Sequence, residues 1–103
     1  MGKNRDIKSV VVLLVNTVVH EIVAMHTNKP ESKQFLNKEA IEYRGQAKEA
    51  FDLHTWNEFD KAHIKEKAIK EINKIMVSKY LDVASKEKEV EALVDEEIHK
   101  LRV

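Results

Sequence analysis

The length of 103 residues fits one domain, residues 1–103, built around a single hydrophobic core. Apolar residues make up 43% of the chain and charged residues 35%, with only two glycines and one proline, which favours long helices over a turn-rich β fold. Eighteen basic and eighteen acidic residues cancel, which disfavours indiscriminate binding to polyanions, and the absence of cysteine excludes disulfides, thiolate metal sites and cysteine nucleophiles.

A valine-rich segment near residues 8–26 is the first predicted helix. Its polar residues gather on one side, and apolar residues fill an arc of about 220° on a helical wheel. A buried strand over Val10–Val15 is the competing interpretation, because valine favours strands. Such a wide arc predicts a central helix buried on more than one side, or a helix that also meets a second subunit. The predicted dimer interface on this helix consists of Val11, Val15, Val18, Val19 and Ile22.

The same apolar run raises the question of a membrane span. From Val10 to Met25 it is shorter than the roughly 20 residues that a spanning helix needs, and polar residues interrupt it. The small-residue cleavage pattern that follows a signal-peptide core is also missing. We therefore expect a cytoplasmic protein with no membrane partner.

The second predicted helix covers residues near 31–53. Asn28 favours a turn, and Pro30 stops the first helix while suiting the first turn of the next. Apolar residues then recur at spacings of three and four along a narrow stripe. The alanines on this stripe predict close approach of a neighbouring helix.

The third predicted helix covers residues near 55–81. Thr55 and Glu58 have the spacing of a capping box, which places the helix start at Thr55. A single helix running unbroken from about 31 to 80 is the alternative, although it would be unusually long for a globular domain. Trp56 and Phe59 project away from the apolar stripe of this helix, so we assign both to the predicted interface.

The fourth predicted helix covers residues near 85–102, with Asp82 or Ser85 as its cap. Short connections join all four segments. The sequence thus predicts an all-α fold, a four-helix and mostly antiparallel bundle with the valine-rich first helix at its centre.

Five histidines suggest a metal-binding helical bundle as one hypothesis. Three pairs have a spacing that suits such sites: Asp60 with His63, Glu96 with His99, and His54 with Glu58. Glu96 and His99, however, fall opposite the apolar side of their helix, and His54 precedes a predicted helix start. We therefore predict no metal site and no cofactor, and keep the metal-binding bundle as the third hypothesis for the function.

Lysines of the third helix suggest a second hypothesis, a nucleic-acid-associated protein. The residues expected to contact phosphates in this case are Lys61, Lys65, Lys70 and Lys74. The fourth helix is acidic over its length, which argues against its insertion into the DNA major groove. Lysine is also a common residue of solvated helix surfaces, so nucleic acid is the less favoured partner.

Motifs for catalysis are absent from the sequence, including the Gly-x-Ser-x-Gly elbow and Gly-rich phosphate loops. We therefore expect a protein that is not an enzyme and has no catalytic residues. The favoured hypothesis is a small helical interaction protein, an adaptor or regulator, that acts through self-association or a protein partner. A homodimer is the favoured state, because the wide apolar arc and the alternating charge blocks suit contact between subunits.

Overall fold

The computed structural model describes residues 2–53, 55–79 and 87–101. These residues form four α-helices: α1 (Gly2–His26), α2 (Pro30–Phe51), α3 (Glu58–Lys79) and α4 (Glu87–Leu101). The all-α class is confirmed, and the valine run over 10–15 is helical. The predicted caps Asp82 and Ser85 lie outside the described residues.

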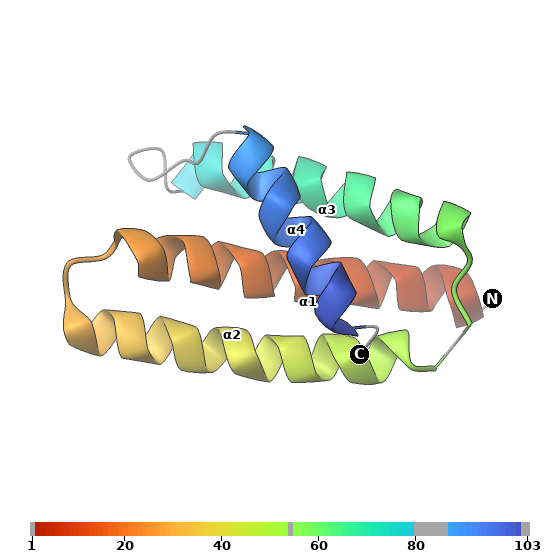
Figure 1. Ribbon diagram of the computed structural model, residues 1–103, viewed down its shortest axis with the longest axis horizontal. Coiled ribbons are helices and arrows are strands. Elements are labelled where there is room, and N and C mark those ends of the chain that lie inside the picture. The colour runs from red at the N-terminus through yellow and green to blue at the C-terminus, as the bar shows by residue number, and fades with distance from the viewer. Residues whose placement is uncertain (1, 54, 80–86, 102–103) are drawn as a thin grey trace.

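The first helix, α1, contacts each of the other three helices. Figure 1 shows α1 between α2 and α3, with α4 crossing this layer obliquely on one side. α1 and α2 run in opposite directions on either side of a connection of three residues, 27–29. Because α4 lies across the other helices, the regular antiparallel bundle stays a prediction.

The core is one continuous cluster of buried apolar side chains. α1 contributes Val10, Leu14, Val18 and Ile22, which are spaced four residues apart and are almost completely buried. This spacing keeps the four side chains along one side of the helix. Each such side chain contributes roughly 1.5–3 kcal/mol relative to an exposed one. The side chains that complete the core from the other helices include Ala47, Ile64, Ala68, Ile72, Met76, Val90, Val94 and Leu101.

The connection between α2 and α3 settles where the third helix starts. Asn57 Oδ1 accepts a hydrogen bond from the Asp60 amide at 2.7 Å, and the Asn57 amide donates to Asp60 Oδ2 at 3.3 Å. This reciprocal pair is a capping box, so the predicted start at Thr55 is wrong by three residues. Trp56 lies outside the helix and stacks on Phe51 with ring centroids 5.4 Å apart, while its indole N–H donates to the Phe51 carbonyl. The helix therefore breaks between α2 and α3.

Replacing Asn57 with alanine is expected to lower the free energy of unfolding by about 1 kcal/mol, because the Asp60 amide loses its acceptor. Urea denaturation followed by circular dichroism measures the change. The matched control is Thr55→Ala, which removes a hydroxyl from an exposed residue of the same connection. An equal loss in the control would show that Thr55 also contributes to the cap.

Candidate functional site

The most unusual chemistry of the molecule is an ionic cluster where α1, α2 and α4 meet. Arg44 of α2 donates two hydrogen bonds to Glu97 of α4, from Nε to Oε1 at 2.6 Å and from Nη2 to Oε2 at 3.2 Å. Lys100 Nζ lies 3.2 Å from Glu97 Oε2. Only 1% of the Glu97 surface is exposed, so these cations provide the compensation that a buried carboxylate requires.

A second carboxylate, Glu21 of α1, belongs to the same cluster. Its Oε1 atom is 3.5 Å from Arg44 Nη2 and is buried without a hydrogen-bond partner among the described residues. Burial raises the pKa of Glu21 to about 7, helped by a hydrogen bond with Glu97 and by the Glu97 charge. Burial also opposes ionisation of Glu97, yet the hydrogen bonds from Arg44 and Glu21 hold its pKa below the ordinary value. Below neutral pH, Glu21 is therefore the protonated partner of an ionised Glu97.

This cluster joins three helices, and its charges are directed at one another. The signals in the sequence are local: Glu21 interrupts a valine-rich helix, and Arg44 falls one turn from two buried alanines, Ala40 and Ala47. Neither signal predicts that Arg44 pairs with Glu97, because the two residues are 53 positions apart in the sequence. The arrangement stabilises the junction of the three helices.

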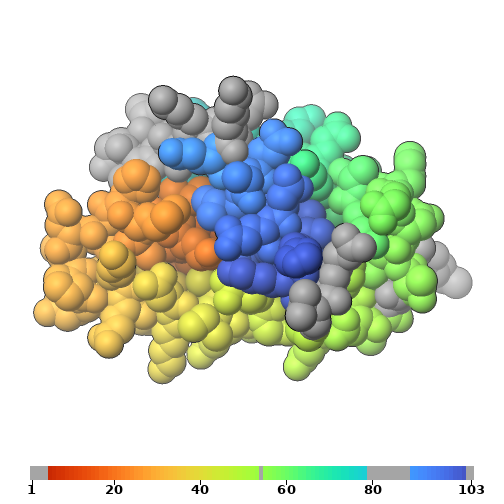
Figure 2. Space-filling model, in the orientation of Figure 1, coloured from red at the N-terminus to blue at the C-terminus, as the bar shows by residue number. Residues whose placement is uncertain are grey.

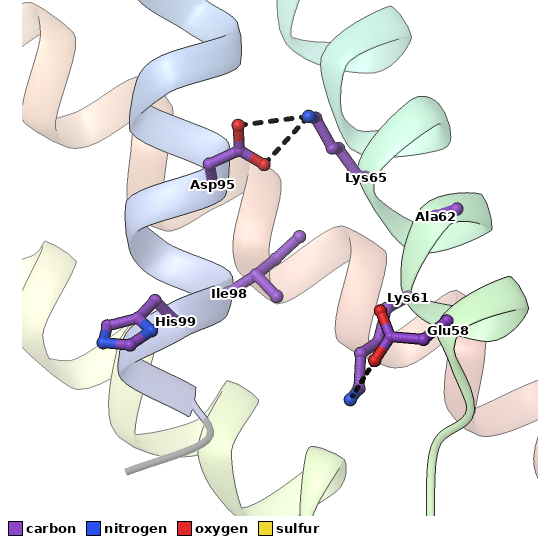
Figure 3. Close-up of a pocket in the computed structure, with 7 residues that line it drawn as sticks. All are labelled: Glu58, Lys61, Ala62, Lys65, Asp95, Ile98 and His99. Carbon is purple, nitrogen blue, oxygen red and sulfur yellow. Dashed lines mark hydrogen bonds and ion pairs between the residues drawn. The ribbon is translucent and has the colours of Figure 1, made fainter.

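An open groove of about 310 Å³ separates the start of α3 from the end of α4 (Figure 3). Its lining comprises Glu58, Lys61, Ala62, Lys65, Asp95, Ile98 and His99. In Figure 3, ion pairs flank the space: Lys65 Nζ lies 2.9 Å from Asp95, and Lys61 Nζ lies 3.3 Å from Glu58. Between them the lining is apolar, with Ile98 buried and Ala62 exposed. The groove thus combines an apolar floor with a balanced charged rim.

Lys65 is a central contact between α3 and α4. Besides Asp95, it reaches Glu91 at 3.3 Å, and the hydrogen bond to Asp95 raises the pKa of Lys65 above its ordinary value. The charge of this lysine is therefore already engaged within the chain.

Of the predicted interface residues, six belong to the core of the single chain. These buried side chains are Val11, Val15, Val18, Val19, Ile22 and Trp56. Most of the wide apolar arc of α1 is covered by three neighbouring helices, with Val12 and Met25 left exposed, and Trp56 is held against Phe51. Phe59 alone among the seven is presented to solvent, with 80% of its surface exposed.

The four predicted phosphate-contacting lysines do not lie on one side of α3. Lys61 and Lys65 line the groove beside α4. Lys70 and Lys74 follow Lys61 and Lys65 by nine residues, a rotation of about 180° around the helix axis. They are exposed on the other side of α3. A continuous phosphate-contacting stripe through all four residues is therefore ruled out by the helix geometry.

The candidate metal ligands are dispersed over the part of the chain that the structure describes, where no three His, Asp or Glu side chains gather in a group able to hold a metal ion. Asp60 caps α3, and Glu96 lies 3.7 Å from Lys100. His54 lies outside the described residues. His20 packs on Tyr43 at 5.2 Å, and its Nδ1 lies 2.7 Å from the Asn16 carbonyl oxygen.

One helical segment, Arg5–His26, is long and apolar enough to cross a membrane by length and composition. Half of its most apolar window is buried against the other helices, and both the core helix of a soluble protein and an N-terminal signal sequence meet the same criterion. Comparison with protein-family models, curated proteins and solved structures finds no match.

Proposed function

We propose that this chain is a small, mostly antiparallel four-helix bundle that acts as a non-enzymatic interaction protein, an adaptor or regulator. It works by self-association, with a dimer of identical chains as the smallest assembly, in the cytoplasm. The ionic cluster supports a role outside catalysis, because its charged groups pair with one another and so join α1, α2 and α4.

The observation that carries this proposal is the exposure of large apolar side chains. The exposed residues of this kind are Val12, Met25, Phe35, Ile41, Leu53, Phe59 and Val77. Phe59, the most exposed, is the i−3 neighbour of Ala62 in the lining of the α3–α4 groove. A highly exposed phenylalanine one helical turn from the lining of a groove is the type of anchor residue on which protein interfaces depend.

Sedimentation velocity over a dilution series tests the proposal. The wild-type chain is expected to associate in the micromolar range, and Phe59→Ser is expected to weaken association at least tenfold, about 1.4 kcal/mol. The matched control is Val77→Ser, an equally polar change at a residue of α3 that is also largely exposed. This control lies at the far end of the helix from the groove.

Two results would contradict the proposal. A wild-type chain that stays monomeric at all concentrations would remove self-association. Equal weakening by both substitutions would show that Phe59 has no special place in the contact. Unchanged circular dichroism spectra would confirm that both variants keep their helices.

A further inference from the structure

The face of the molecule opposite α4 is defined by helix geometry. On α3, Lys65 reaches towards α4, and Lys67 lies about 200° further around the helix axis. On α1, Glu21 faces the α4 side, and Val12 lies nine residues earlier, about 180° around the axis. Lys67 and Val12 therefore share the side away from α4, which we call the back face.

Two adjoining hollows occupy this back face. One of about 450 Å³ is lined by Arg5, Lys8, Ser9, Val12 and Leu13 of α1. The other, about 310 Å³, is lined by Ile7, Lys8 and Val11 of α1 with His63 and Lys67 of α3. Lys8 borders both hollows, and no carboxylate is among the described residues that line either one. The back face thus combines exposed cations with accessible apolar side chains.

The opposite surface, here called the front face, is formed by α4, which lies across the side turned to the viewer in Figure 2. α4 carries six acidic residues and two lysines within 15 residues. Glu89, Glu91, Asp95 and Glu96 are all exposed, and the small Ala92 lies exposed among them. Lys65 offsets part of the charge of Glu91 and Asp95, and Lys100 lies 3.7 Å from Glu96. Glu89 and Glu96 are the exposed acids farther from Lys65. The front face is the acidic counterpart of the back face.

We propose that the back face binds the front face of a second copy of this chain, so that α4 of one copy lies across the hollows formed by α1 and α3 of the next. This contact rests on the self-association of the proposed function. Phe59 precedes the back-face residue His63 by four residues, which places it on the same side of α3. The occupant follows from charge complementarity, because two hollows whose described lining holds cations and no carboxylate are present with an acidic helix on the same neutral chain.

The position of the two faces fixes the symmetry of the contact. A two-fold dimer joins the same surface patch of both copies, whereas here the complementary patches lie on opposite sides of one molecule. The contact is therefore head-to-tail. Each dimer retains one unoccupied back face and one unoccupied front face, so addition of further copies continues as the concentration rises.

Mixing two charge-reversed variants tests this geometry. Lys8→Glu with Lys67→Glu disables the back face, and Glu89→Lys with Glu96→Lys disables the front face. Each variant alone is expected to be monomeric, because one of its two complementary faces is reversed. An equimolar mixture is expected to associate again, because the unchanged acidic front face of the first variant fits the unchanged basic back face of the second, and the two reversed faces are complementary as well. The matched control, Lys33→Glu with Lys38→Glu, reverses two exposed lysines of α2 away from both hollows and should associate like the wild type.

Sedimentation velocity at low and high salt reads out each sample, with circular dichroism to confirm folding. Wild-type association should weaken at least tenfold between about 50 and 300 mM salt, since the contact is between opposite charges. If the single-residue variants Lys67→Glu and Glu96→Lys associate as strongly as the wild type, the head-to-tail contact is wrong while self-association stands. Monomeric variants that form no heterodimer on mixing would also overturn it. A wild-type chain that is monomeric at low salt would remove the proposed function together with this contact.

Discussion

Replacing Arg44 with methionine is expected to lower the free energy of unfolding by about 3–5 kcal/mol. The substitution keeps much of the side-chain volume but removes both hydrogen bonds to Glu97 and the ion pair with Glu21. Glu97 would remain buried with Lys100 as its remaining cation in the cluster. The loss is a large fraction of the stability of a small domain, and denaturation in guanidinium chloride measures it.

The matched control is Lys38→Met, which removes an exposed cation from the same helix. This change should alter the free energy of unfolding by less than about 0.5 kcal/mol. A loss below 1 kcal/mol in Arg44→Met would contradict the assignment of Arg44 as the group that compensates the buried carboxylates.

Raising the pH from 5 to 8 is expected to lower the free energy of unfolding by about 1–3 kcal/mol through Glu21. Its folded pKa of about 7 lies above the unfolded value of 4.5, so the folded chain holds this proton across a window in which the unfolded chain has lost it. The contribution of protonated Glu21 to the free energy of unfolding is at its full value below about pH 4.5 and is lost as the pH rises through 7. The charged groups that face Glu21 are Arg44 from α2 and Glu97 and Lys100 from α4.

Glu21→Gln isolates this effect from the other pH-dependent contributions to stability. Glutamine resembles the protonated carboxyl, so the variant should match the wild type near pH 5 and exceed its stability at pH 8. Urea denaturation at half-unit pH intervals gives both curves. Parallel curves for the two proteins would show that Glu21 ionises normally in the folded chain.

The helices themselves follow from local sequence patterns. The four-residue spacing of Val10, Leu14 and Val18, together with Pro30 at the first turn of α2, places the body of α1 and the start of α2. α1 itself begins at Gly2, six residues before the predicted start near residue 8. The start of α3 is harder to predict from the sequence, because Thr55 with Glu58 and Asn57 with Asp60 both have the spacing of a capping box. The structure uses the second pair, with Trp56 outside the helix and against Phe51, a tertiary contact that no local pattern contains.

The surfaces were predicted less well than the helices. A wide apolar arc on α1 has the same sequence pattern whether neighbouring helices or a second subunit cover it, so burial of Val15 or Val18 within the chain could not be deduced. The separation of Lys61 from Lys70, by contrast, follows from helix periodicity alone. Prediction of the pairing between Glu97 and Arg44 requires the direction in which α4 crosses the other helices, and this direction depends on the packing of the whole core.

The valine content of α1 affects the unfolded chain as well as the folded one. Val10–Val15 holds six consecutive apolar residues, four of them valine, without charge, glycine or proline. Such a hexapeptide has a modest intrinsic preference for the helix and the composition of segments that stack into cross-β fibrils. Its helical state is maintained by the helices packed around it. Newly synthesised chains therefore remain vulnerable to aggregation until α2, α3 and α4 have enclosed this segment, and substitutions that slow that step would reduce the yield of soluble protein.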